Sequence, residues 1–309
     1  MQTARERLNF IDALRGLVIV LMALDHVSHF FNPLPFNSLD LAHTSGPIFM
    51  TRWITHLCAP IFIFLAGTSA WLYGQSVSKA QLSRFLLTRG AWLVFLEVTF
   101  INLSWANIFG GVVVLQVMWA LGISMMILAG LIHLPRYWLI GIAVLAIFGH
   151  DAFNGWHAKD LGNWGGIWAM LHERHFFKLT DNGGIFLLYP LLPWFAVMAA
   201  GYAFGPVMQL PAAVREKRLL LCGAALLLLM LVLRWPNLYG EVVPWAEQSR
   251  GSWFSLLSFI NFSKYPPSLL YLCITLGLGA WLLAAMARLP EARLKLFLVF
   301  GRVPMFFYL

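Results

Sequence analysis

The chain has 309 residues, of which 60% are hydrophobic and 11% are charged. Soluble domains contain about 45–50% apolar and about 25% charged residues, so this composition excludes an ordinary soluble enzyme, a disordered tail and a small disulfide-linked module. In so apolar a chain, the net charge of +8 indicates basic loops on one side of a membrane and no nucleic-acid partner. The sequence therefore predicts a polytopic membrane protein.

Apolar segments long enough for membrane helices recur along the whole chain, since a helix crosses a bilayer with about 20 mostly apolar residues. We predict an all-α transmembrane bundle of about nine spans, the last one incomplete, near residues 13–31, 54–73, 91–109, 112–132, 137–149, 185–205, 219–235, 269–287 and from 296 onwards. The stretches 150–184 and 236–268 are rich in Trp, Gly, Asn and Pro, which predicts ordered loops with partial helix. We expect residues 1–309 to form one integral membrane domain that lacks its C-terminal helices, which leaves the activity of this stretch open.

The orientation follows from the lysines and arginines, because cytoplasmic loops carry an excess of them. With the N-terminus in the cytoplasm, thirteen of the 21 cations lie on the cytoplasmic side and six on the other. Eight of the nine histidines fall on the outer side or in the outer half of a span. We therefore expect a cytoplasmic N-terminus.

The three cysteines give no sign of metal or disulfide chemistry. Cys58, Cys222 and Cys273 are far apart and each lies in an apolar segment. Their spacing fits neither a metal site nor a disulfide framework. We expect no bound metal and interpret all three as small core residues.

The first predicted helix carries ionisable residues along one face. Steps of three and four residues place a set of side chains on that face, namely Asp12, Arg15, Ile19, Met22, His26 and His29. Arg15 lies near the cytoplasmic end, whereas His26 lies beside Asp25 in the outer half. Ionisable groups at membrane depth usually line a cavity or pathway, and a neutral imidazole suits proton acceptance near pH 7. The alternative is that Asp12 and Arg15 only anchor the helix end.

Further polar residues continue inside a later span. Glu97 lies eight residues after Arg89, which is about 12 Å at 1.5 Å per residue. A lone carboxylate at that depth costs several kcal/mol, so we expect Glu97 to be protonated or partnered. It acts either as a structural buttress or as the group that orients a catalytic histidine. Asn102 extends this polarity towards the outer face.

Two motifs carry a resemblance to a known family. The pattern Asp12-x-x-Arg15-Gly16 followed by His26 resembles the opening helix of the transmembrane acyltransferases, which include the acyltransferase-3 group. The stretch 52–69, which reads RWITHLCAPIFIFLAGTS, is similar to the catalytic-domain family of heparan-α-glucosaminide N-acetyltransferase, in its bacterial branch. Together the motifs cover about residues 7–73.

This resemblance implies a multi-helix enzyme that takes an acyl group, acetyl in this family, from cytosolic acyl-CoA. The enzyme would pass it to a carbohydrate or glycolipid acceptor on the far side of the membrane. The histidine of the acyltransferase-3 group falls on His26 and its arginine on Arg15. The animal acetyltransferases have a histidine before the second helix, where His43 is the nearest here but out of register, and an acid where His56 stands. The catalytic histidine therefore stays open among His26, His43 and His56.

Acyl transfer to an amine or hydroxyl needs a base for its proton and cations for the CoA phosphates. The candidates for the phosphates lie on the predicted cytoplasmic side and are Arg15, with Asp12 beside it, Arg84 and Arg89. Arg52 and Asn102 lie towards the acceptor. Asp25 or Glu97 would orient the catalytic histidine.

Two other classes of protein compete with the enzyme. A proton-coupled transporter would use the His, Asp and Glu residues as a relay, although the inverted repeats typical of transporters are not visible in the sequence. A non-catalytic membrane protein is the other alternative. The acceptor, the acyl-chain length, an acyl-histidine intermediate and the oligomeric state are all left open.

Overall fold

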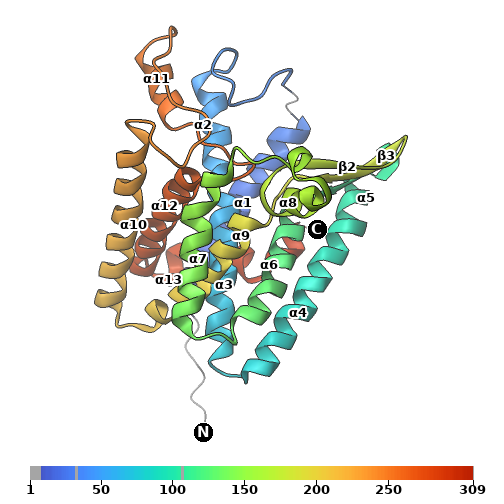
Figure 1. Cartoon of the computed structure of the whole chain (residues 1–309). Helices are drawn as coiled ribbons and strands as arrows, with labels where there is room; N and C mark the ends of the chain where they lie inside the picture. The colour runs from blue at the N-terminus through green and yellow to red at the C-terminus, as the bar shows by residue number, and fades with distance from the viewer. Residues whose placement is uncertain (1–7, 32–33, 106–107, 309) are drawn as a thin grey trace.

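The structure is a computed structural model of the whole chain, and it describes residues 8–31, 34–105 and 108–308. Helices dominate it, as predicted, and the long ones run up or down one bundle (Figure 1). α1 (Asn9–Phe31) rises towards the end of the bundle where α11 (Ser252–Phe259) lies. We call this the α11 end of the molecule.

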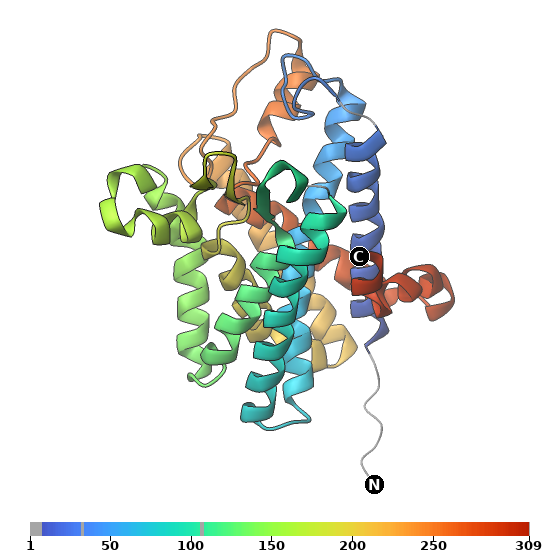
Figure 2. The ribbon, with the colours of Figure 1, turned by 90° about the vertical axis from the view of Figure 1, so that its right-hand side faces the viewer.

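The remaining long helices alternate in direction along the bundle (Figures 1 and 2). α2 (Gly46–Ile54), the 3-10 turn η1 (Thr55–Leu57) and α3 (Cys58–Gly74) lead away from the α11 end. α4 (Lys79–Leu96) returns and continues through a π-helical segment, η2 (Glu97–Ile101), into α5 (Asn102–Ser104). The alternation continues through α6 (Val117–Leu131), α7 (Arg136–Gly149), α9 (Leu192–Phe204), α10 (Ala212–Arg234) and α12 (Leu269–Arg288).

Four helical stretches among the described residues are long and apolar enough to cross a membrane, by length and composition: Gly46–Gly74, Lys79–Ser104, Arg136–Phe153 and Leu269–Arg288. α6 is a shorter apolar helix. These features fit the predicted integral membrane protein. The number of nine spans and the cytoplasmic N-terminus stay predictions.

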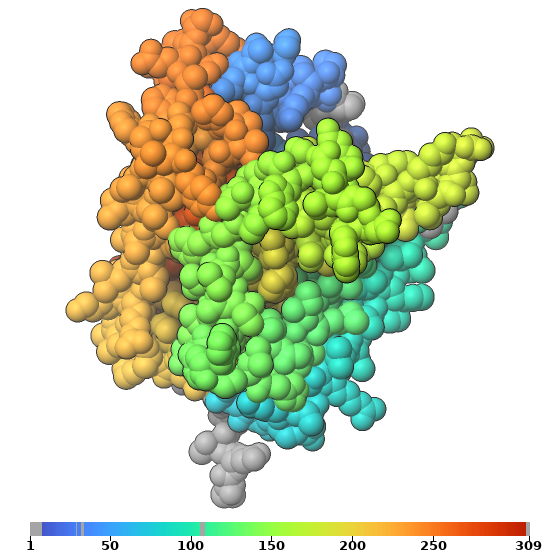
Figure 3. Space-filling model, viewed as in Figure 1, coloured from blue at the N-terminus to red at the C-terminus, as the bar shows by residue number. Residues whose placement is uncertain are grey.

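Two runs that were predicted as parts of membrane helices form a small sheet instead. β1 (Val112–Leu115) pairs in parallel with β3 (Gly183–Leu187), and β2 (His175–Thr180) pairs antiparallel with the other edge of β3. The consecutive valines of β1 favour an extended backbone, because β-branched side chains pack well on a pleated surface. The β2–β3 hairpin projects from the side of the bundle (Figure 3). The chain is thus mostly helical, with one sheet.

The loops at the α11 end are ordered and partly helical, as predicted. Between α7 and β2 they contain short helical elements, namely η4 (His150–Phe153), η5 (Ala158–Asp160), η6 (Gly162–Trp164) and α8 (Gly165–His172). Two further 3-10 turns lie elsewhere, η3 (Ile108–Gly110) and η7 (Gly205–Gln209). The segment between α10 and α12 contains α11 and forms the top of the molecule together with the α1–α2 connection (Figure 3).

The predicted ninth span is a helix pair with a break. α13 (Glu291–Arg302) packs against α1, and α14 (Pro304–Tyr308) follows after Val303. Glycines make the α1–α13 contact close. A Cβ atom on Gly16 would lie 1.8 Å from the Phe297 carbonyl oxygen, and one on Gly301 would lie 1.8 Å from the Asp12 carbonyl oxygen. Backbone packs directly on backbone here, as in membrane helix pairs with small residues at the interface.

Candidate active site

One cavity of about 400 Å³ brings together polar residues from several elements of the bundle. Side chains from α1, from the continuous helical stretch α2–η1–α3, from α6 and from the loops of the α11 end line it. α14 adds Pro304 and Met305. We call it the His26 cavity. Its polar and aromatic lining consists of Asp25, His26, Arg52, Thr55, Trp105, Gln116, Tyr189, Lys264 and Tyr265.

An ion pair joins the first two elements of this cavity. Arg52 of α2 donates from Nη1 to Oδ1 of Asp25 on α1. The Thr55 hydroxyl donates to the same carboxylate oxygen at 2.9 Å. Charge-assisted hydrogen bonds of this kind are stronger than neutral ones. Asp25 is therefore held in place by one residue of α2 and one of η1.

His26 follows Asp25 on α1 and lines the same cavity. Its ring meets the ring of Trp105 edge to face, with the centroids 5.2 Å apart and the planes at 87°. Trp105 also contacts Phe30, one turn further along α1. The imidazole and the ion pair thus line one cavity, an arrangement that suits a positioned proton acceptor.

The loop before α12 completes the cavity from the α11 end. We call Ser263–Ser268 the strap, because it lies across the cavity and supplies both Lys264 and Tyr265. The Lys264 ammonium lies 5.2 Å from the centroid of the Tyr265 ring. The hydroxyl groups of Tyr265 and Tyr189 are 3.2 Å apart and share a hydrogen bond.

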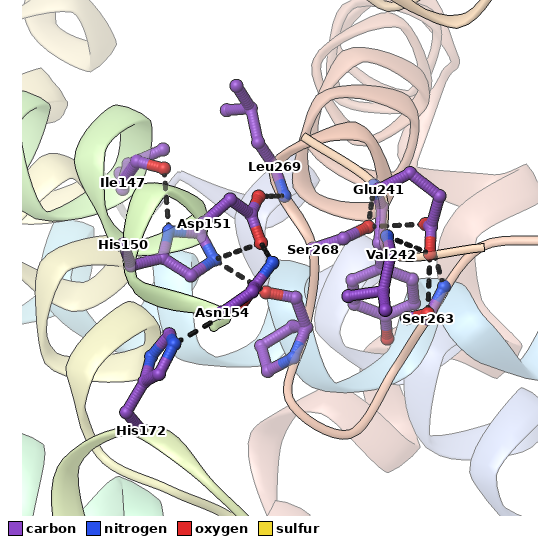
Figure 4. A network of polar contacts seen from close by, with 12 residues as sticks. Ile147, His150, Asp151, Asn154, His172, Glu241, Val242, Ser263, Ser268 and Leu269 are labelled. Carbon is purple, nitrogen blue, oxygen red and sulfur yellow. Dashed lines mark hydrogen bonds and ion pairs between the residues drawn. The ribbon is translucent and has the colours of Figure 1, made fainter. Parts of the chain in front are cut away.

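A buried network holds one side of the strap (Figure 4). His150 is 1% exposed, and its Nε2 donates to the Pro267 carbonyl oxygen at 2.8 Å while Nδ1 faces the Ile147 carbonyl oxygen at 2.8 Å. Both ring nitrogens therefore lie against backbone carbonyl oxygens, which accept hydrogen bonds. Asp151 lies 3.6 Å from His150 and accepts from the Leu269 N–H at 2.7 Å, at the start of α12.

Glu241 holds the other side of the strap (Figure 4). Its carboxylate accepts from the N–H of Ser263 at 2.9 Å and also from the Ser263 hydroxyl. It accepts from the Ser268 hydroxyl at 2.7 Å, and this hydroxyl in turn accepts from the Tyr271 N–H and caps α12. Both ends of the strap are therefore bound to one carboxylate.

His172 extends the network towards α8. Its Nε2 contacts the Asn154 amide oxygen at 3.2 Å, and Nδ1 has no hydrogen-bond partner among the residues that the structure describes. Burial, together with the neighbouring His150, lowers the pKa of His172 to about 4. His172 is thus neutral at pH 7 and belongs to the support of the strap, away from the cavity lining.

Arg15, with Asp12 beside it, was predicted to contact the CoA phosphates. Both residues lie near the N-terminal end of α1, outside the cavity lining, and connect helices there. Arg15 pairs with Asp12 at 2.9 Å and donates from Nη2 to the Ser69 hydroxyl of α3 at 2.7 Å. Nη1 also reaches the Gly301 carbonyl oxygen of α13 at 3.4 Å. The guanidinium therefore joins α1, α3 and α13 next to the close α1–α13 crossing.

Glu97 and Asn102 fit the structural role that the sequence left open. Glu97 is fully buried, and its Oε2 accepts from the N–H groups of Met118 at 3.0 Å and Trp119 at 3.2 Å. These groups are free donors at the start of α6, so the carboxylate caps that helix. Asn102 exchanges hydrogen bonds with the backbone of Val114 and thereby joins α5 to β1.

The two other candidate histidines lie outside the cavity lining. His43 is exposed and pairs with Asp40 at 2.6 Å, and this hydrogen bond lowers the pKa of Asp40. His56 is 3% exposed in η1, packs edge-on against Tyr271, and its Nε2 has no hydrogen-bond partner within the described part of the chain. Of the three candidates, His26 is the one that lines the cavity.

The remaining predicted cations lie far from this cluster. Arg84 and Arg89 are exposed on α4, where Arg89 lies over the Phe85 ring at 5.5 Å. Neither residue is among those that line the His26 cavity. Their contact with the CoA phosphates stays a prediction, and it would take place on the exposed surface of α4.

The described residues contain no group of three or more His, Cys, Asp and Glu side chains placed to hold a metal ion. Acid–base chemistry is what the cavity offers: an imidazole, an ion pair, two phenol hydroxyl groups and a lysine surround one space. An imidazole can take a proton from an amine or hydroxyl, and nearby donors can polarise a carbonyl group.

Sequence reasoning missed Trp105, Tyr189, Lys264 and Tyr265. Lys264 was counted as one of the six cations on the predicted outer side, and that count hid it among topology signals. A signal was nevertheless present. Outer loops carry few lysines and arginines, and Lys264 stands in a predicted outer loop, directly before Tyr265-Pro266-Pro267.

A family of known proteins matches the chain. The family model described as heparan-alpha-glucosaminide N-acetyltransferase, catalytic, matches residues 7–235. This range contains the whole of α1 to α10 and therefore Asp25, His26 and Arg52, whereas the strap follows it. No curated protein matches the chain.

Proposed function

This chain belongs to the family of heparan-alpha-glucosaminide N-acetyltransferase catalytic domains, and on that premise we propose that it transfers an acetyl group from cytosolic acetyl-CoA to a carbohydrate or glycolipid acceptor. The apolar helices make it an integral membrane protein. Under the proposal, the N-terminus lies in the cytoplasm, the α11 end lies outside, and nine spans cross the inner membrane of a bacterium.

His26 is the proton acceptor in this reaction. The acceptor amine or hydroxyl attacks the thioester carbonyl carbon, and the imidazole takes the proton of the attacking group. The new C–N or C–O bond forms, the C–S bond breaks, and the proton passes from His26 to the departing CoA thiolate. The Asp25–Arg52 pair supports this step because it fixes the helical turn that carries His26.

The donor approaches along the face of α1 that the sequence singled out. Ile19 and Met22 of that face line the His26 cavity, and Arg15 lies on the same face towards the opposite end of α1. An acetyl group that reaches His26 from the cytoplasm would pass these residues. The observation that carries the proposal is that one cavity unites His26, the Asp25–Arg52 pair and this face of α1.

The test is acetyl-CoA turnover by purified protein, with His26→Ala and His26→Gln as variants. We expect wild-type protein to bind acetyl-CoA and to release free CoA, and both variants to lose about 10²–10⁴-fold in rate, as is usual for a general base. Binding of acetyl-CoA should persist in the variants, because His26 acts on the acceptor proton.

His133→Ala is the matched control, since His133 is exposed at the other end of the bundle between α6 and α7 and should retain full rate. Full activity of His26→Ala would reject the assignment of His26, and loss in His43→Ala or His56→Ala would transfer it. Wild-type protein that neither binds nor turns over acetyl-CoA would reject the enzyme.

A further inference from the structure

The His26 cavity contains one more cationic than anionic side chain. Arg52 is neutralised by Asp25. Lys264 is 9% exposed, and its ammonium makes no ion pair within 4 Å and no hydrogen bond among the residues that the structure describes. The ammonium lies over the face of the Tyr265 ring, and Asp25, which is already paired with Arg52, also attracts it across the cavity. A cation–π contact offsets only part of the cost of burying a charge.

Lys264 is held at the cavity, because hydrogen bonds at both ends of the strap restrain its backbone. Glu241 binds Ser263 immediately before Lys264 and Ser268 at the far end. The Ser268 N–H also donates to the Ser263 carbonyl oxygen at 3.0 Å, which closes the strap on itself. The buried His150 then holds Pro267 (Figure 4). Polar networks that are satisfied in this way rigidify their surroundings.

The neighbours of Lys264 supply hydrogen bonds to an anion. Tyr189 and Tyr265 place two hydroxyl groups at the cavity wall. Arg52 binds Asp25 through Nη1, which leaves Nη2 and Nε of the guanidinium for another acceptor. Hydrogen bonds from cationic donors to carboxylate, sulfate or phosphate oxygens are short and strong. Charge and donor geometry therefore both favour a negatively charged ligand.

We propose that the His26 cavity contains an anion subsite in which Lys264, supported by Arg52, binds a carboxylate, sulfate or phosphate group of the acceptor. That the ligand is the acceptor rests on the proposed function, whereas the binding of the anionic group does not. The chemistry separates acidic sugars from neutral ones: a neutral sugar leaves Arg52 and Lys264 with the single carboxylate of Asp25, and an acidic sugar supplies a second negative charge.

The experiment measures binding to purified protein by calorimetry at constant ionic strength. Glucose and glucuronate form a matched pair of probes that differ in the C6 carboxylate, and glucose 6-sulfate and glucose 6-phosphate extend the series. We expect wild-type protein to bind an acidic sugar at least about tenfold more tightly than glucose, which is the effect of about 1.4 kcal/mol. Acetate and sulfate ions alone show whether a free anion suffices without the sugar.

Lys264→Met should abolish the preference for the acidic sugar, and Lys264→Arg should retain most of it. Lys159→Met is the matched control, because Lys159 is exposed on a loop of the α11 end, and it should bind like wild type. Equal affinity of wild-type protein for glucose and all three acidic sugars overturns the subsite, whether or not Lys264→Met folds. An unchanged preference in folded Lys264→Met also overturns it.

The outcomes keep the two proposals apart. Anion preference without acetyl transfer to any sugar would reject the proposed function and support the subsite. Acetyl transfer without anion preference would do the reverse. A response to free acetate or sulfate equal to that of the acidic sugars would overturn the assignment of the subsite to the acceptor.

Discussion

The ion pair between Asp25 and Arg52 links the first two helical elements, and the cost of breaking it follows from its surroundings. The Arg52 side chain is 30% exposed and that of Asp25 is 21% exposed. Exposed pairs contribute about 0.2–1 kcal/mol, whereas breaking a buried pair costs about 3–5 kcal/mol. We expect an intermediate loss of about 1–3 kcal/mol in the free energy of unfolding for Arg52→Gln.

Asp25→Asn should cost more than Arg52→Gln, although both variants break the same pair. The loss of Asp25 leaves two cations, Arg52 and Lys264, around one cavity without a compensating carboxylate. The loss of Arg52 leaves Lys264 to face Asp25. Adding Lys264→Met to Asp25→Asn should therefore restore part of the stability, and the Asp25→Asn, Arg52→Gln double variant should lose less than the sum of the two.

The assay is unfolding in detergent micelles followed by tryptophan fluorescence, combined as a double-mutant cycle. Independent sites add within about 0.3–0.5 kcal/mol, so additivity of Asp25→Asn and Arg52→Gln within that range would refute the electrostatic reasoning. An equal loss for both single variants would refute the role of Lys264. Lys178→Gln is the control, because the Lys178–Asp181 pair has side chains that are 64% and 96% exposed and should not change the stability.

Two further predictions concern the supports of the cavity. Glu97→Ala removes the acceptor for two N–H groups at the start of α6 and should cost about 2–3 kcal/mol, whereas Glu97→Gln keeps one acceptor oxygen and should cost about 1 kcal/mol. Equal thermal shifts for these variants would contradict the cap. The pKa of His172 is lowered to about 4 from an ordinary value of 6.5, so between these values the unfolded chain binds a proton that the folded chain excludes. The free energy of unfolding should fall as the pH falls from about 6.5 to about 4, and less steeply in His172→Asn; parallel melting-temperature curves for the two proteins would contradict this.

The helices were predictable because each carries its signal locally. The apolar run 137–149 became α7 and the run 269–287 became α12, almost residue for residue. The sheet was not predictable by the same means. Val112–Leu115 is as apolar as a membrane helix, and what makes it a strand is its pairing with Gly183–Leu187, far along the chain. Apolarity alone does not separate a buried strand from a buried helix.

The candidate site, like the fold, was predictable from the sequence only in part. His26 was predicted from one helix face, Asp25 as its neighbour in the chain, and Arg52 from the motif that follows. Lys264 joins them because α12 packs into the bundle and its cap holds the strap, a relation between distant residues that the sequence does not display. Glu97 shows the converse: a carboxylate at membrane depth indicates a site, but the N–H groups it binds belong to the start of a neighbouring helix.

The strap also sets the order in which the cavity comes into being. Asp25, His26, Arg52 and Trp105 enter the membrane early in synthesis, and at about 5–20 residues per second the ribosome adds Lys264 roughly 10–30 s after Trp105. During this interval the nascent chain carries the ion pair and the imidazole without the wall that encloses them. The segment between α10 and α12 therefore adds Lys264 and Tyr265 late, and the lining is complete only when α14 has added Pro304 and Met305. A chain that is arrested before this segment should be inserted in the membrane yet inactive.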